Sequence, residues 1–121
     1  MSKLEQFSFE KLAVYQKSLD LSVELTLLAS KFPMKFIRLR DQLIGAVISV
    51  PLNIAEGSGR KSRKDQINFY KTARSSIFEC IPIIEICYRI RLINNAENSN
   101  YREKIVTISK MLSGLINSLV I

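Results

Sequence analysis

No histidine and no tryptophan occur anywhere in this sequence of 121 residues. The lack of histidine removes the commonest general base of enzymes and a frequent metal ligand. Glycine and proline are also scarce, with four and three residues, which argues against a β-rich or disordered chain. These absences disfavour an enzyme and favour a helical protein, since 47% of the residues are hydrophobic and can form a core.

Only two cysteines are present, Cys80 and Cys87, and they lie seven residues apart in a helical pattern. Two helical turns separate their Cα atoms by roughly 10 Å, at ~1.5 Å per residue. A disulfide requires a Cα separation below about 7 Å. We therefore expect two buried thiols and a reducing compartment, because a free cysteine behaves as a small apolar residue.

The chain also lacks long apolar runs. No stretch of about 18 apolar, uncharged residues occurs, so no membrane span is expected. Residues 1–6 do not resemble a signal peptide, because they contain no apolar run. The sequence therefore predicts a cytoplasmic protein of one domain, residues 1–121, since this length suffices for one core but not for two.

Acidic residues are fewer than basic ones, at 11 against 18, which gives a net charge of +7. The excess is concentrated in one place. Residues 60–74 carry six basic residues and one acidic residue, a net charge of +5. A local excess of this size creates a field that attracts anions, so this segment is the first candidate for a binding surface.

The spacing of apolar residues predicts four helices and no strand. The first begins at Ser8, which can cap it after a loose leader of residues 1–7. The fourth begins at an N-cap between Asn98 and Asn100. Four helices with short connections favour an all-α fold, an antiparallel up-down-up-down four-helix bundle. The expected helices are residues 8–31, 34–57, 62–92 and 98–119.

Polar residues, glycine and proline mark the joins between these helices. Ser62, followed by Asp65 three residues later, predicts the start of the third helix. The segment Gly57-Ser58-Gly59 is expected to end the second helix, because glycine adopts the left-handed cap conformation at little cost. Pro51 removes one backbone hydrogen bond, so the second helix either bends there or breaks into two at Val50.

Three of the four predicted helices carry apolar residues on two sides, although a helix of a small monomeric bundle needs only one apolar face. In the second helix, Leu43 and Val50 lie on one side, and Ile44 and Ile48 lie on the other. Apolar surface of this extent usually marks an interface. We therefore expect a homo-oligomer. The alternative is that these residues are ordinary exposed leucines and isoleucines.

Polar side chains form matching rows on the second and third helices, because positions three, four or seven residues apart share one side of a helix. The two rows could build a site between the helices. The structural interpretation is favoured, in which interhelical hydrogen bonds fix the register. Without histidine the rows do not resemble a di-iron site, so no metal and no cofactor are expected. The rows, called here the polar ridge, are Gln42, Ser49, Asn53 and Glu56 on the second helix and Thr72, Ser75, Ser76 and Glu79 on the third.

A basic patch occupies the corner between the second and third helices. Its natural ligand is phosphate, which nucleic acid presents in series. No aromatic residue lies within residues 60–68, so we expect contacts to the nucleic-acid backbone rather than base stacking. The alternative is a solvated run of charge that only aids solubility. The basic patch consists of Arg60, Lys61, Arg63, Lys64, Lys71 and Arg74.

The stretch from Ser49 to Gly57 resembles the S-[IV]-x-x-N-I-A-E-G signature of the bacterial four-helix-bundle proteins encoded in intervening sequences of 23S ribosomal RNA genes. Residues 69–79 are similar to the F-x3-A-x-[SG]-S-x2-E pattern of the same family. The resemblance extends over roughly residues 7–119. Ile44 and Gly45 depart from it, because the family often has basic residues there, which weakens the case for nucleic-acid contacts from the second helix.

The resemblance implies an antiparallel bundle that assembles as a homopentamer and has a nucleic-acid-associated role. A related bundle is an accessory factor of the reverse transcriptase of diversity-generating retroelements, where it is thought to bind nucleic acid through a basic surface. We therefore predict a non-enzymatic oligomeric bundle that binds RNA or other structured nucleic acid through the basic patch. The alternative is a structural module that docks a protein partner, such as a reverse transcriptase, and has no direct nucleic-acid role.

Overall fold

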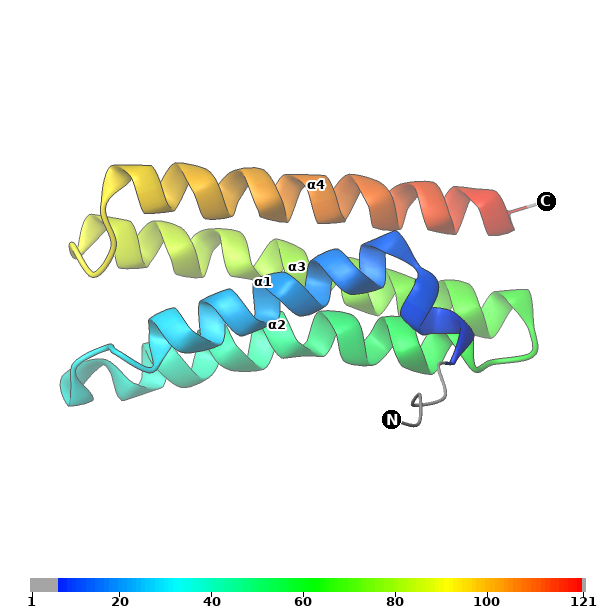
Figure 1. The fold of residues 1–121 in the computed structure, drawn as a ribbon, viewed down its shortest axis with the longest axis horizontal. Helices are drawn as coiled ribbons and strands as arrows, with labels where there is room; N and C mark the ends of the chain where they lie inside the picture. The colour runs from blue at the N-terminus through cyan, green and yellow to red at the C-terminus, as the bar shows by residue number, and fades with distance from the viewer. Residues whose placement is uncertain (1–6, 121) are drawn as a thin grey trace, which may run out of the picture.

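The computed structural model describes residues 7–120, and the loose leader predicted for residues 1–7 lies outside this range except for Phe7. The described residues form four α-helices and two short 3₁₀ turns, without a strand (Figure 1). This agrees with the predicted all-α fold of four helices. The elements are η1 (Ser8–Lys11), α1 (Ala13–Ala29), η2 (Met34–Phe36), α2 (Ile37–Ser58), α3 (Arg63–Arg89) and α4 (Asn95–Leu119).

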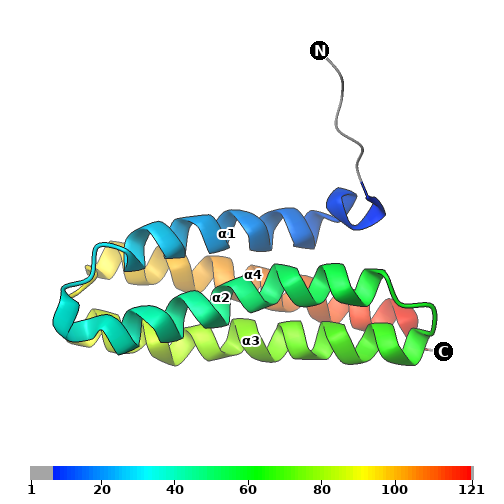
Figure 2. The ribbon, with the colours of Figure 1, turned by 90° about the horizontal axis from the view of Figure 1, so that it is seen from below.

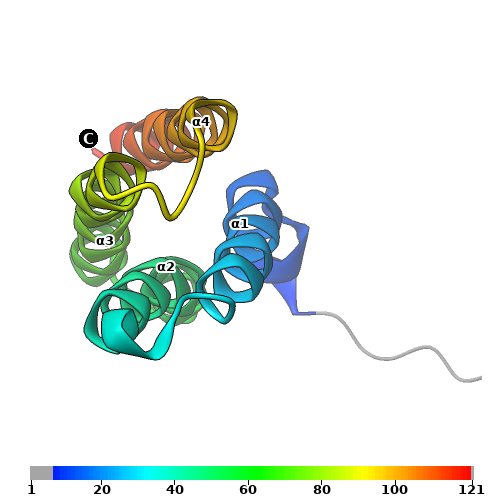
Figure 3. The ribbon, with the colours of Figure 1, turned by 90° about the vertical axis from the view of Figure 1, so that its left-hand side faces the viewer.

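The connections between the helices alternate between the two ends of the bundle. The α1–α2 and α3–α4 connections lie at one end, and the α2–α3 connection lies at the other (Figures 1 and 2). Each helix packs mainly against its neighbour in the sequence, and α1 and α4 make few contacts with each other. Seen from the end, the helices form a row that curls round but leaves a gap between the first and last ribbons (Figure 3).

The core is formed by apolar side chains from all four helices. Leu25 of α1, Val47 of α2, Ile77 of α3 and Leu112 of α4 are each fully buried. Complete burial of one such side chain stabilises the fold by ~1.5–3 kcal/mol. The Ser22 hydroxyl lies in this core and donates a hydrogen bond to the Val47 carbonyl oxygen at 3.1 Å, which ties α1 to α2.

Two helix starts differ from the sequence prediction. Ser8 begins a single 3₁₀ turn rather than α1, and α1 follows Leu12 without a side-chain cap. The fourth helix starts earlier than expected, because Asn94 caps it and not a residue of 98–100. The Asn94 side chain accepts from the Glu97 amide at 2.8 Å, while the Glu97 carboxylate accepts from the Asn94 amide at 2.9 Å. This reciprocal pair satisfies two amides that a bare helix start would leave without a partner.

The start of α3 is as predicted, since the Ser62 hydroxyl accepts a hydrogen bond from the Asp65 amide at 3.1 Å. The helix ends at Arg89, a few residues before the expected position near Leu92. Arg91 follows this end of the helix. Its φ of 66° lies in the left-handed region, which reverses the chain toward α4.

The alternative of a break at Val50 is wrong, because α2 runs without interruption through Pro51. The expected left-handed glycine cap is also wrong. Gly59, which follows α2, has φ of −85°, and no glycine among the described residues has a positive φ. Gly57 has a different role. A Cβ atom placed there would lie 2.9 Å from the Phe69 Cβ and 2.9 Å from a ring carbon of Tyr70, so glycine permits α2 to approach α3 closely.

Candidate nucleic-acid interface

The polar ridge makes one direct hydrogen bond between α2 and α3. The Ser49 and Ser76 hydroxyl oxygens lie 2.9 Å apart, both half-buried. The Asn53 amide nitrogen donates to the Ser49 carbonyl oxygen at 2.8 Å and to its hydroxyl oxygen at 2.9 Å. Asn53 therefore supports the serine pair from its own helix.

The other five members of the polar ridge are exposed. Glu56 forms an ion pair with Arg60 at 3.5 Å, and Thr72 donates to a carbonyl oxygen of its own helix. The structure therefore shows one half-buried serine pair where the sequence predicted a longer row of interhelical bonds. The exposed members are Gln42, Glu56, Thr72, Ser75 and Glu79.

Two members of the basic patch are held by contacts within the bundle. The Arg60 guanidinium lies over the Phe69 ring, 4.7 Å from its centroid, in addition to its pairing with Glu56. Arg74 is half-buried and donates to the Ser113 hydroxyl of α4 at 3.2 Å. These contacts hold both arginine side chains against the bundle.

The other four members of the basic patch are exposed and make no ion pair within residues 7–120. Two of them, Arg63 and Lys64, occupy the first turn of α3, whose positive end already attracts anions. Asp65 is the one acidic residue of that turn. These exposed cations, available for a ligand, are Lys61, Arg63, Lys64 and Lys71.

Sequence reasoning missed one partner of the patch, Ser113 of α4. Lys110, an exposed cation, lies three residues before Ser113, so the two residues share one side of α4. The hydrogen bond between Ser113 and Arg74 places that side of the helix next to α3. Only the pairing of α3 with α4 reveals this, because the two segments are far apart in the sequence.

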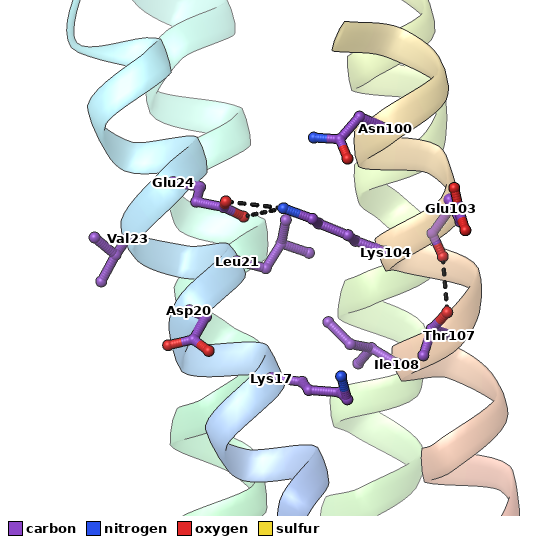
Figure 4. Close-up of a pocket in the computed structure, with 10 residues that line it drawn as sticks. All are labelled: Lys17, Asp20, Leu21, Val23, Glu24, Asn100, Glu103, Lys104, Thr107 and Ile108. Atoms are coloured by element: carbon purple, nitrogen blue, oxygen red, sulfur yellow. Dashed lines mark hydrogen bonds and ion pairs between the residues drawn. The ribbon is translucent and has the colours of Figure 1, made fainter. Parts of the chain in front are cut away.

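A groove between α1 and α4 has a volume of about 620 Å³ (Figure 4). One ion pair crosses it, in which the Lys104 Nζ atom lies 2.8 and 2.9 Å from the two Glu24 carboxylate oxygens. No member of the basic patch or polar ridge lines this groove. Within residues 7–120 no group of three or more histidine, cysteine or acidic residues could hold a metal ion.

Both cysteines are buried free thiols. Burial raises the pKa of Cys80 to about 12, with a smaller contribution from the negative charge of Glu79. Burial likewise raises the pKa of Cys87 to about 11. The thiolate form is the reactive form of cysteine, so neither side chain is suited to nucleophilic chemistry at neutral pH.

These shifts predict that the protein loses stability in alkali. The thiols ionise near pH 9 in the unfolded chain but near pH 11–12 in the fold, so unfolding releases protons above pH 9. Each thiol should lower the free energy of unfolding by about 1.4 kcal/mol per pH unit above pH 9, until its folded pKa is reached. Urea unfolding between pH 8 and 11 measures this slope. The variant with Cys80→Ala and Cys87→Ala should show a smaller slope, and an equal slope would exclude the thiols as its cause.

The fold and the basic patch define a class of protein, the small all-α helical bundles with a strongly basic surface at one helix connection. Residues 10–114 match the family described as 23S rRNA-intervening sequence protein. The chain belongs to this family, as the resemblance between residues 49 and 79 predicted. None of its described helices is both long and apolar enough to cross a membrane.

A solved structure supports the fold. It is a protein of unknown function from the S23 ribosomal protein family of Bacteroides thetaiotaomicron, 24% identical to this chain, with a TM-score of 0.78. The alignment covers 86% of this chain and 98% of the other. At this identity the likeness concerns the fold alone. Comparison with curated proteins gives no match.

Proposed function

We propose that this protein is a non-enzymatic subunit of a ring-like homo-oligomer, an up-down-up-down bundle that binds RNA or other structured nucleic acid by phosphate contacts. One observation carries the proposal. Four exposed cations without an ion pair in the described chain, Lys61, Arg63, Lys64 and Lys71, lie in the α2–α3 connection and the first three turns of α3. The description of the family, which refers to 23S ribosomal RNA, is consistent with an RNA ligand and with a cytoplasmic location.

The character of the patch favours phosphate as the group that is bound. Phe69 is the nearest aromatic residue, and the Arg60 guanidinium covers it, so it is a poor platform for a base. Lys64 and Lys71 are seven residues apart on α3, and both are exposed. Two helical turns place their Cα atoms about 10 Å apart on one side of the helix, which suits contacts to successive positions on a nucleic-acid backbone.

Exposed apolar side chains support the proposed homo-oligomer, for which we propose five subunits as in the family resembled. Leu52 of α2 is 64% exposed and Phe78 of α3 is 50% exposed. Val23 and Leu27 expose a further apolar side on α1, one turn apart. Buried between subunits, these residues would no longer contact water. A ring would also repeat the basic patch on every subunit and strengthen its field.

Neutralising the four exposed cations should weaken RNA binding strongly. For the variant with Lys61, Arg63, Lys64 and Lys71 all changed to glutamine, we expect a loss of affinity on the order of 100-fold. The slope of log K against log salt concentration should become shallower by about 0.9 for each duplex phosphate contact removed. Fluorescence anisotropy with a labelled RNA duplex at several salt concentrations measures both quantities.

The matched control is a pair of single variants, Lys64→Gln in the patch and Lys17→Gln on α1, which remove the same charge from exposed positions. Only the first should lower the affinity clearly. An unchanged affinity in the fourfold variant would show that the basic patch is not the binding site.

The second candidate function is a module that docks a protein partner, such as a reverse transcriptase, and the exposed apolar residues favour it. The partner would present an acidic surface to the basic patch. Nucleic acid and an acidic protein surface would both bind by electrostatic attraction, so the salt dependence of binding does not distinguish them. Binding of polyglutamate as tight as binding of RNA or DNA, at equal charge and salt, would favour the protein partner.

A further inference from the structure

A second group of exposed cations lies at the end of the bundle opposite to the basic patch. Residues 30–40, which join α1 to α2, contain four basic residues and no acidic residue. The α3–α4 connection, at the same end, adds Arg91 (Figures 1 and 2). The exposed cations at this end that make no ion pair within residues 7–120 form the distal cluster, which consists of Lys31, Lys35, Arg38 and Arg91.

The other arginines near this end are already paired. Arg40 contacts Asp41 at 3.0 Å. Arg89 and Arg102 share the carboxylate of Glu85, at 2.8 and 3.8 Å. Asp41 and Glu85 therefore pair with these three arginines, and the distal cluster has no ion-pair partner within residues 7–120.

The position of Arg38 at the start of α2 is unfavourable in the free protein. The positive end of a helix is stabilised by acidic residues and destabilised by basic ones. α2 has no acidic residue in its first turn and no side-chain cap, yet Arg38 lies there. By contrast, α4 begins at the same end of the bundle with a full capping box of Asn94 and Glu97. A bound anion would relieve the repulsion at the start of α2, as it would at Arg63 and Lys64 on α3.

We infer that the distal cluster is a second phosphate-binding surface, so that one subunit holds two nucleic-acid segments at opposite ends. The choice of nucleic acid as the ligand rests on the proposed function, whereas the site itself does not depend on it. α2 separates the two surfaces with 22 residues, a length of about 33 Å. This exceeds the Debye length of about 8 Å at physiological salt, so the two surfaces bind independently.

A bridging experiment tests the inference with the full-length protein. A biotinylated RNA duplex is immobilised, the protein is bound to it, and capture of a second, fluorescent RNA duplex that cannot anneal to the first is measured. The wild type should capture the second duplex. The variant with Lys31, Lys35 and Arg38 all changed to glutamine should lose this capture at least about 10-fold, while its affinity for the first duplex falls no more than about 3-fold.

Single variants provide the matched control, because Lys35→Gln and Lys17→Gln each remove one exposed lysine charge. Only Lys35→Gln should reduce capture. If the threefold variant captures the second duplex as well as the wild type, neighbouring basic patches of an oligomer hold it, which overturns the inference and leaves the proposed function intact. If the wild type binds neither duplex, the proposed function fails and the inference fails with it.

Discussion

Replacing Gly57 with alanine should destabilise the fold by about 1–3 kcal/mol, the range expected for an overpacked core. The new Cβ atom would lie 2.9 Å from the Phe69 Cβ, an atom that cannot turn away because it is attached directly to the backbone of α3. α2 and α3 must therefore move apart. This movement also strains the hydrogen bond between the Ser58 and Tyr70 hydroxyls, which are 2.9 Å apart. Thermal or urea unfolding followed by circular dichroism measures the loss.

Gly45→Ala is the control for this substitution. Gly45 also lies within α2, but a Cβ atom at this position would meet no neighbouring atom within 4 Å. Alanine is a better helix former than glycine, so this variant should gain about 0.5–1 kcal/mol. The two substitutions add the same atom to the same helix, and the expected changes in the free energy of unfolding have opposite signs. A gain in stability from Gly57→Ala would contradict the close approach of α2 to α3.

Replacing Leu52 with glutamate should dissociate the proposed oligomer into single chains. Leu52 is 64% exposed in the isolated subunit, so a charge there costs little in the monomer. In an interface the same carboxylate would be buried without a partner, at a cost of several kcal/mol. Light scattering should show the mass falling from a multiple of 13.8 kDa to 13.8 kDa, with the helical circular dichroism spectrum retained.

Asn117→Glu provides the control for the change of mass. It places the same charge at an exposed position of α4, the helix for which the sequence predicts a single apolar face. This variant should keep the mass of the wild type. A wild-type protein that is already monomeric would contradict the proposed assembly, whatever the variants do.

Local signals in the sequence locate some helix ends and miss others. Ser62 is predicted correctly because a cap depends on the residues that immediately follow it, here Asp65. The same kind of signal is present in Asn94 and Glu97, which have the spacing of a capping box. Asn100 and Glu103 have the same spacing, so this pattern alone does not decide between Asn94 and Asn100. The prediction for Ser8 is wrong for a different reason, since the chain forms a 3₁₀ turn before α1.

Contacts between distant residues account for what the sequence does not predict. The sequence indicates a left-handed cap within Gly57-Ser58-Gly59, whereas the lack of a side chain at Gly57 accommodates Phe69 on another helix. The basic patch is evident from composition, but the anchoring of Arg60 by Phe69 and of Arg74 by Ser113 depends on helix packing. Composition therefore reveals where charge is concentrated, and the fold reveals which of those charges are available.

The way the helices pack in a row has a consequence for how the protein folds. Because each helix contacts mainly the one before it in the sequence, most native contacts join residues that are close along the chain. Folding rates rise as contacts become more local, and helical bundles of this kind fold in microseconds to milliseconds. Since α1 contacts α4 only slightly, α1 can pack against α2 before α4 has folded.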